Sequence, residues 1–164
     1  MTEPQGSRAP WLLLLVCVPT LFWGIWSVSF LDPDEGLYGA IAQEMVQRGD
    51  WITPHFNGLP YLEKPPLYFW LGALMFALFG PSEWGVRFWS ALPALGSVLL
   101  TWRMGRWLYG PSAGVLSGLA LGTSIGYSLY VRKASTDFLF VFALTLAPRL
   151  ALANDWSEEQ IPKL

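Results

Sequence analysis

The sequence predicts an all-α, multi-pass transmembrane helical protein, and three observations support this fold class. The 164 residues are 53% hydrophobic and only 13% charged, whereas a soluble domain carries about 25% charged residues. Ten Trp raise the aromatic content to 16%, and Trp and Tyr concentrate where hydrocarbon meets water. Long apolar runs recur along the chain, separated by polar segments.

Residues 11–31 form the first predicted span, since about twenty apolar residues cross the hydrocarbon core of a bilayer. The run is uncharged, and Arg8 precedes it. A cleavable signal peptide is the alternative, with Ser27-Val28-Ser29 as a small-residue cleavage site. The apolar core of a signal peptide is about 7–15 residues long. Because this run is longer and carries several aromatic residues, we favour an uncleaved first helix.

A hydrophilic outer loop is predicted next, over residues 32–83. Its first part, residues 32–66, holds eight charged side chains. Asp32 or Asp34 is placed to N-cap a helix, and Gly49 to end it in the left-handed conformation. Between them, apolar side chains recur every four residues and polar side chains take the other face, which predicts an amphipathic helix along the membrane surface. The apolar positions are Leu37, Ile41 and Met45, and the polar ones are Gln43, Glu44, Gln47 and Arg48.

Residues 67–79 are apolar but too few to span a bilayer. At 1.5 Å per residue they reach about 20 Å, against a hydrocarbon core of about 30 Å. We therefore predict an interfacial or re-entrant helix at this point. The next span, residues 84–107, then returns inward and delivers Arg103 and Arg106 to the cytoplasm, as the positive-inside rule requires.

Two further spans are predicted over residues 112–131 and 138–153. The first of these is rich in Gly and Ser, which permits close helix packing. It ends at Arg132-Lys133 on the outer side, against the positive-inside bias. The second is interrupted by Pro148 and is a weak span. We assign residues 1–147 to one transmembrane domain and residues 148–164 to a divergent polar tail.

Several functional classes are disfavoured by the composition. The chain has no run of basic residues and a formal net charge of -2, so nucleic acid is not an expected partner. Its single cysteine, Cys17, excludes an intrachain disulfide and a cysteine-rich metal site. His55 has no second histidine with which to form a metal-binding pair.

The parity of the spans places three separated charged stretches on the outer face, where their side chains can converge. Each stretch also has a simpler interpretation, as helix caps, a solvated ion pair or interfacial anchors. Lys64 is held on a stiff backbone by Pro65-Pro66, and such a cation suits a phosphate, of which a lipid phosphate is the obvious source at that depth. The converging residues are Asp34, Glu35, Glu63, Lys64, Arg132, Lys133 and Asp137.

Two motifs resemble a known family over residues 10–147. They are Asp32-Pro33-Asp34-Glu35-Gly36-Leu37-Tyr38 and Tyr61-Leu62-Glu63-Lys64-Pro65-Pro66-Leu67. Together they are similar to the N-terminal part of the aminoarabinose (lipid A) transferases, which belong with the dolichyl-phosphate-mannose protein mannosyltransferase-like enzymes. These are GT-C fold glycosyltransferases that take sugar from a polyprenyl phosphate.

The resemblance implies roles for the matching residues. Asp34 matches the first-loop aspartate that activates the acceptor hydroxyl, or orients substrates where the acceptor is a phosphate, and Glu35 is grouped with it as catalytic. Lys64 and Tyr61 match positions that hold the leaving phosphate, and Glu63 a position near a divalent cation. Asp137 matches a second cavity aspartate. The expected substrate-binding set is Tyr61, Lys64, Arg132, Lys133 and Asp137.

The expected reaction moves a sugar from undecaprenyl phosphate to an outer-face acceptor such as lipid A. It would take place in the bacterial inner membrane, with the N-terminus cytoplasmic, the first loop periplasmic and membrane lipids as neighbours. Family members have about a dozen spans, so this chain is expected to be an N-terminal piece that is inactive alone. The alternatives are a non-catalytic binder of polyprenyl phosphate and a protein O-mannosyltransferase-like enzyme. A transporter or channel is disfavoured because the charges lie at the ends of the spans.

Overall fold

A computed structural model describes residues 9–26 and 33–153 of the chain. The elements in chain order are α1 (Ala9–Phe22), α2 (Pro33–Arg48), β1 (His55–Phe56), β2 (Leu59–Pro60), α3 (Leu67–Phe79), α4 (Glu83–Tyr109), α5 (Pro111–Gly122), α6 (Ile125–Val131) and α7 (Asp137–Ala153). The predicted all-α class is confirmed, with one short hairpin added. Among the described residues no single helix is both long enough and apolar enough to cross a membrane, and the bent pair α5–α6 meets that test by length and composition only.

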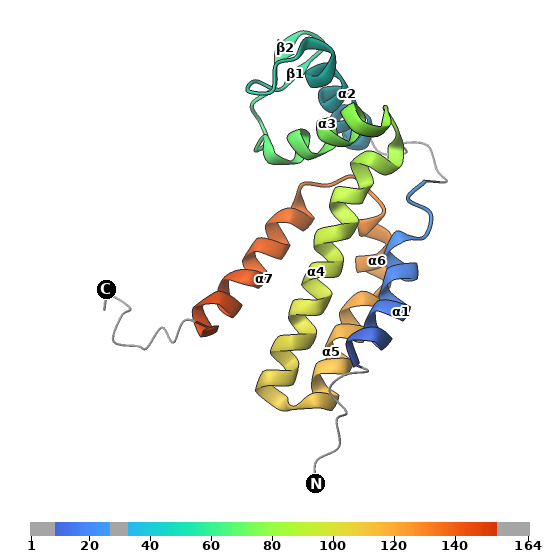
Figure 1. Cartoon of the computed structure of the whole chain (residues 1–164), viewed down its shortest axis with the longest axis vertical. Coiled ribbons are helices and arrows are strands. Elements are labelled where there is room, and N and C mark those ends of the chain that lie inside the picture. The colour runs from blue at the N-terminus through green and yellow to red at the C-terminus, as the bar shows by residue number, and fades with distance from the viewer. Residues whose placement is uncertain (1–8, 27–32, 154–164) are drawn as a thin grey trace, which may run out of the picture.

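Helix α4 is the axis of the molecule (Figure 1). It contacts α1, α5 and α6 as well as α7. Helices α2 and α3 and the β1–β2 hairpin gather at one end of this bundle, opposite the end at which α1 begins. Helices α2 and α3 with the hairpin, called the end group below, and the bundle therefore form two regions that meet near the start of α4.

Each region has its own hydrophobic core. The first core lies between α2 and α3 and reaches Val86 of α4 and Ala134 beyond α6. The second core fills the bundle, where Leu13 and Cys17 of α1 meet Val98 of α4. Because Ala134 belongs to the first core, the segment between α6 and α7 is packed against the end group.

The amphipathic pattern predicted for α2 is present. Ile41 and Met45 are buried, whereas Gln43 and Gln47 are exposed. Asp34 lies within the first turn of the helix rather than at its N-cap, and Asp32 lies outside the described residues. Gly49 ends the helix as predicted, with a φ of 69° that only glycine adopts without strain.

The hairpin follows from its turn sequence. Asn57 and Gly58 have φ values of 50° and 81°, and positive φ at both central residues is the requirement of the tight turn that matches strand twist. The register pairs Phe56 with Leu59. Glu44 of α2 accepts a hydrogen bond from the Gly58 amide at 2.9 Å, which fixes the hairpin to the helix.

Three of the predicted helices fit the structure closely and two differ. Residues 67–79 form α3 as expected, and α4 and α7 match their predicted runs within two residues. The run predicted over 11–31 is helical only to Phe22, and its last residues lie outside the described part. The run predicted over 112–131 bends by 55° between α5 and α6. At that bend the Thr123 hydroxyl bonds the Leu119 carbonyl at 2.7 Å, and such local bonds compete with regular helix geometry.

Candidate functional site

A polar cavity lies where the end group meets the segment between α6 and α7. Its volume is about 240 Å³, and it brings together four of the predicted site residues. They are Asp34 from α2, Lys64 from the loop before α3, Lys133 from the segment between α6 and α7 (called the far segment below), and Asp137 from the start of α7. Three stretches that are widely separated in sequence therefore meet in one place. The remaining lining residues are Tyr38, Tyr130, Ala134 and Ser135.

The two neighbouring carboxylates in the first turn of α2, Asp34 and Glu35, point in different directions. Successive residues on an α-helix are turned by about 100°, so Asp34 and Glu35 cannot share a face. Asp34 is exposed and lines the cavity, whereas Glu35 is 2% exposed and does not. The first turn of a helix favours both negative charges.

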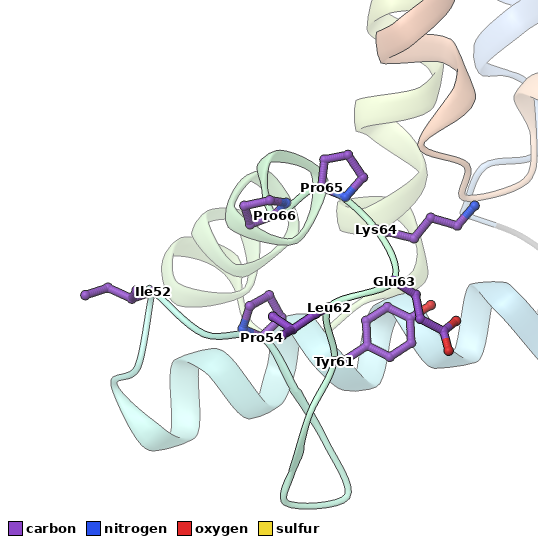
Figure 2. Close-up of a pocket in the computed structure, with 8 residues that line it drawn as sticks. All are labelled: Ile52, Pro54, Tyr61, Leu62, Glu63, Lys64, Pro65 and Pro66. Carbon is purple, nitrogen blue, oxygen red and sulfur yellow. The ribbon is translucent and has the colours of Figure 1, made fainter.

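A second pocket of about 380 Å³ adjoins the cavity on the side of the loop before α3. Figure 2 shows Tyr61 and Glu63 projecting to the same side of this loop, and Lys64 reaching away from the two prolines. Lys64 lines both pockets. Lys64 therefore lies at the boundary between the two pockets.

The loop that carries Lys64 is held at both ends. Before it, the Tyr61 amide donates a 2.8 Å hydrogen bond to the Pro54 carbonyl, which continues the hairpin. After it, Pro65 and Pro66 fix their own backbone angles and lead directly into α3. The Lys64 backbone thus sits between a hairpin and a helix start.

Tyr61 and Glu63 line only the second pocket, and two predicted site residues line neither pocket. The Glu35 carboxylate forms a buried ion pair with Arg87 at 3.0 Å, so it acts within the protein rather than toward a ligand. Arg132 is half-buried and does not line either pocket, and its Nε atom is buried without a hydrogen-bond partner. The cation that the far segment offers to the cavity is Lys133.

The pKa values of two tyrosines near the site, Tyr38 and Tyr61, are raised by burial and by neighbouring carboxylates. Burial raises the pKa of Tyr38 to about 12, with the Asp34 and Asp137 carboxylates adding to the effect. Burial and the Glu63 carboxylate, which also bonds the phenol, raise the pKa of Tyr61. Both phenols are therefore neutral hydrogen-bonding groups at physiological pH.

We expect Tyr38 to remain protonated when an ordinary tyrosine, whose pKa is about 10, has ionised. Because the pKa is raised in the folded state, its share of the folding stability is complete below pH 10 and is lost as the pH rises toward 12. Difference absorbance of tyrosinate between the wild type and Tyr38→Phe measures this ionisation. Asp34→Asn should lower the Tyr38 pKa toward its usual value, and an unchanged titration would contradict the placement of Asp34 beside the phenol.

Sequence reasoning missed Tyr38, Tyr130 and Ser135 as cavity residues. A signal existed for Tyr38, since it follows Asp34 by four residues and side chains at that spacing share a helix face. Tyr130 and Ser135 carried no such signal, because only the packing of α6 and of the segment after it brings them to the cavity.

The helical architecture has a counterpart among solved structures. The crystal structure of ArnT from Cupriavidus metallidurans bound to undecaprenyl phosphate matches this chain with a TM-score of 0.80 and 28% identity, over 96% of this chain and 29% of that one. The apo structure of the same protein matches equally well. The chain thus has the fold of the corresponding part of a GT-C membrane glycosyltransferase.

The family is shown by the sequence itself. Residues 63–157 match the model of the dolichyl-phosphate-mannose-protein mannosyltransferase family, and the chain belongs to that family. It resembles the undecaprenyl phosphate-alpha-4-amino-4-deoxy-L-arabinose arabinosyl transferase of Pseudomonas paraeruginosa at 38% identity over 87% of this chain. The protein of the same name from Pseudomonas savastanoi is 48% identical over 55% of this chain. The chain spans 26% and 16% of the length of these two relatives.

Proposed function

We propose that this chain forms the donor-phosphate side of the active site of a GT-C glycosyltransferase. The enzyme would transfer a sugar from undecaprenyl phosphate or another polyprenyl phosphate to an outer-face acceptor such as lipid A. The observation that carries this proposal is the cavity in which Lys64 and Lys133 face Asp34 and Asp137. Its support from relatives is the solved ArnT bound to undecaprenyl phosphate and the arabinosyl transferases of similar sequence.

The chemistry divides between the cations and the acids. As the bond between the sugar's anomeric carbon and the phosphate oxygen breaks, negative charge develops on the leaving polyprenyl phosphate. The ammonium groups of Lys64 and Lys133 stabilise that charge, and the Tyr61 phenol donates to the same phosphate. The acceptor oxygen bonds the anomeric carbon, and Asp34 takes its proton when the acceptor is a hydroxyl. Asp137 orients the sugar.

Membrane placement follows from the same proposal. The bundle of α1 and α4 to α7 would lie in the bacterial inner membrane, with the cavity at the outer face and the N-terminus in the cytoplasm. Helix α3 would lie at the interface. Arg103 and Arg106 near the end of α4 would then lie at the cytoplasmic side, in keeping with the positive-inside rule.

A divalent cation at Glu63 remains a prediction that the described residues do not support on their own. They contain no group of three His, Cys, Asp or Glu side chains that could hold a metal ion. Mg²⁺ is usually held by one or two carboxylates together with substrate phosphates and water, so Glu63 would supply one ligand beside the donor phosphate. No step proposed for this site passes through a metal.

Replacing Asp34 with Asn and Lys64 with Ala tests the proposal in a full-length enzyme that carries this segment. Lys64→Ala is expected to lose about 10²–10³ of the transfer rate, the usual effect of removing one preorganised polar group. Asp34→Asn is expected to lose as much when the acceptor is a hydroxyl, which needs a base. Gln43→Ala, at an exposed position of the same helix, is the matched control. Transfer assays with undecaprenyl-phosphate sugar measure the effect, and unchanged turnover in both variants would refute the assignment.

A protein hydroxyl is the second candidate acceptor, because the matching family is described by protein mannosyl transfer. The two acceptors differ in whether Asp34 must act as a base. A hydroxyl needs a base, so its transfer should fall steeply in Asp34→Asn, whereas a phosphate acceptor is already ionised. Binding of undecaprenyl phosphate with no transfer to either acceptor would identify a non-catalytic lipid-binding protein instead.

A further inference from the structure

A buried ion pair lies directly behind the cavity. Glu35 and Arg87 are 2% and 3% exposed. The Arg87 Nε and Nη2 atoms each donate to one oxygen of the Glu35 carboxylate at 3.0 Å. This two-pronged geometry is the most directional that a guanidinium and a carboxylate can form.

The same pair contacts two further segments. Arg87 Nη1 donates to the Ile25 carbonyl at 3.2 Å, in the turn after α1. The Ala134 amide donates to Glu35 Oε1 at 2.7 Å. The pair therefore connects the end of α1, the start of α2, the start of α4 and the segment between α6 and α7.

The position of these bonds in the chain relates them to the cavity. Glu35 follows Asp34, and Ala134 lines the cavity between Lys133 and Ser135, so the Glu35–Ala134 bond joins the neighbour of one cavity residue to another cavity residue. Neither Glu35 nor Arg87 lines the cavity itself. A shift of the carboxylate would therefore move Asp34 and Lys133 relative to each other.

A second set of bonds reaches the same segment from the Lys64 side. The Ser135 amide donates to Ser90 Oγ at 2.9 Å, and Ser90 Oγ donates to the Ser135 carbonyl at 3.1 Å. The Tyr68 hydroxyl lies 3.1 Å from Ser90 Oγ and donates to the Val86 carbonyl at 2.9 Å. Tyr68 stands four residues after Lys64 in the adjoining helix.

We propose that Glu35 and Arg87 are positioning residues that set the spacing between Asp34 and the Lys133–Asp137 segment, with Ser90 setting the position of that segment relative to Lys64. This inference rests on the proposed function for its relevance to transfer. The geometric part of the inference is that the Glu35–Arg87 pair sets the distance between Asp34 and the Lys133–Asp137 segment. This part does not depend on any ligand. Small errors in such spacing have large effects, since a misplacement of about 1 Å can cost 10²-fold in rate.

The test measures how close position 34 on α2 lies to position 137 at the start of α7. In the full chain carrying Cys17→Ala, cysteines are introduced by Asp34→Cys and Asp137→Cys and joined with a short bifunctional maleimide. Arg87→Lys keeps the charge but loses the two-pronged geometry, and Glu35→Gln keeps the shape but loses the charge. Each is expected to slow cross-linking by about tenfold, because reaction rate follows effective concentration. Arg103→Lys, at an exposed position of the same helix, is the control and should leave the rate unchanged.

The outcomes separate the inference from the proposed function. Unchanged cross-linking in both Arg87→Lys and Glu35→Gln would overturn the positioning role, as would a failure of the parent cysteine pair to cross-link. A loss in both variants, with thermal unfolding still cooperative, supports it. If either variant fails to fold, Ser90→Ala with cysteines introduced by Lys64→Cys and Asp137→Cys decides in the same way. Slowed cross-linking in the variants would support the positioning role. If the unmodified chain at the same time does not bind undecaprenyl phosphate, the proposed function is refuted while the positioning role stands.

Discussion

Replacing Arg87 with Leu is expected to destabilise the folded chain by about 3–5 kcal/mol, because the Glu35 carboxylate stays buried without its cation. The two oxygens of Glu35 each receive one Arg87 hydrogen bond at 3.0 Å, and both would be lost. The Ile25 carbonyl would lose its donor as well. Unfolding of the purified chain in detergent, followed by circular dichroism, measures the change.

The double variant Glu35→Leu with Arg87→Leu should be less destabilised than Arg87→Leu alone. Removing both charges avoids the uncompensated carboxylate, and apolar replacements of buried ion pairs are often close to neutral. The Ala134 amide would still lose its acceptor, at a cost of about 1–3 kcal/mol. Arg103→Leu at an exposed position of α4 serves as the control, with an expected effect within about 0.5 kcal/mol. A double variant as unstable as the single one would show that packing, and not charge, dominates at this position.

Gly114→Ala is expected to destabilise the contact between α4 and α5 by about 1–3 kcal/mol, the range found when extra atoms are forced into a packed interior. A methyl group at this position would lie 2.7 Å from the Trp102 carbonyl oxygen and 2.8 Å from the Arg106 backbone nitrogen. Both are backbone atoms of a helix and cannot move aside as the tip of a flexible side chain could. Thermal unfolding of the variant in detergent measures the cost.

Gly126→Ala is the matched control for this substitution. Gly126 also lies within a helix, but a methyl group there would have no neighbour within 4 Å. Alanine in a helix is favoured over glycine by about 0.5–1 kcal/mol, so this variant should be slightly more stable than the wild type. Equal destabilisation by both substitutions would contradict the close approach of α4 and α5.

The helices could be predicted largely from local pattern. Helix α3 is bounded by Pro66, whose ring fixes its φ, and by Gly80, which permits the positive φ that ends the helix. The bend after Gly122 was missed, because continuous apolar residues predict a straight run and give no sign of a break. Residues 112–131 satisfy the composition of a span whether the helix is straight or bent.

The candidate site was predicted in part because charged residues are conspicuous in an apolar sequence. Asp34, Lys64, Lys133 and Asp137 meet in one cavity, and the parity of the spans had placed them on one face. The division of labour between Asp34 and Glu35 could not be predicted, since it depends on Arg87 and Ala134, far away in sequence. The sequence around Asp34 and Glu35 is compatible with an exposed carboxylate at both positions. Only the tertiary partners distinguish the exposed one from the buried one.

The bond between Glu35 and Ala134 also sets an order of assembly during synthesis. The two residues are 99 positions apart, whereas Glu35 and Arg87 are 52 apart. At about 5–20 residues per second, Arg87 leaves the ribosome about 3–10 s after Glu35, and Ala134 about 5–20 s after it. Until residue 87 has been synthesised, the Glu35 carboxylate has no cation with which to form its buried pair. The cavity is therefore among the last features of this segment to form, and a nascent chain stalled before residue 134 would carry Asp34 and Lys64 without the wall that faces them.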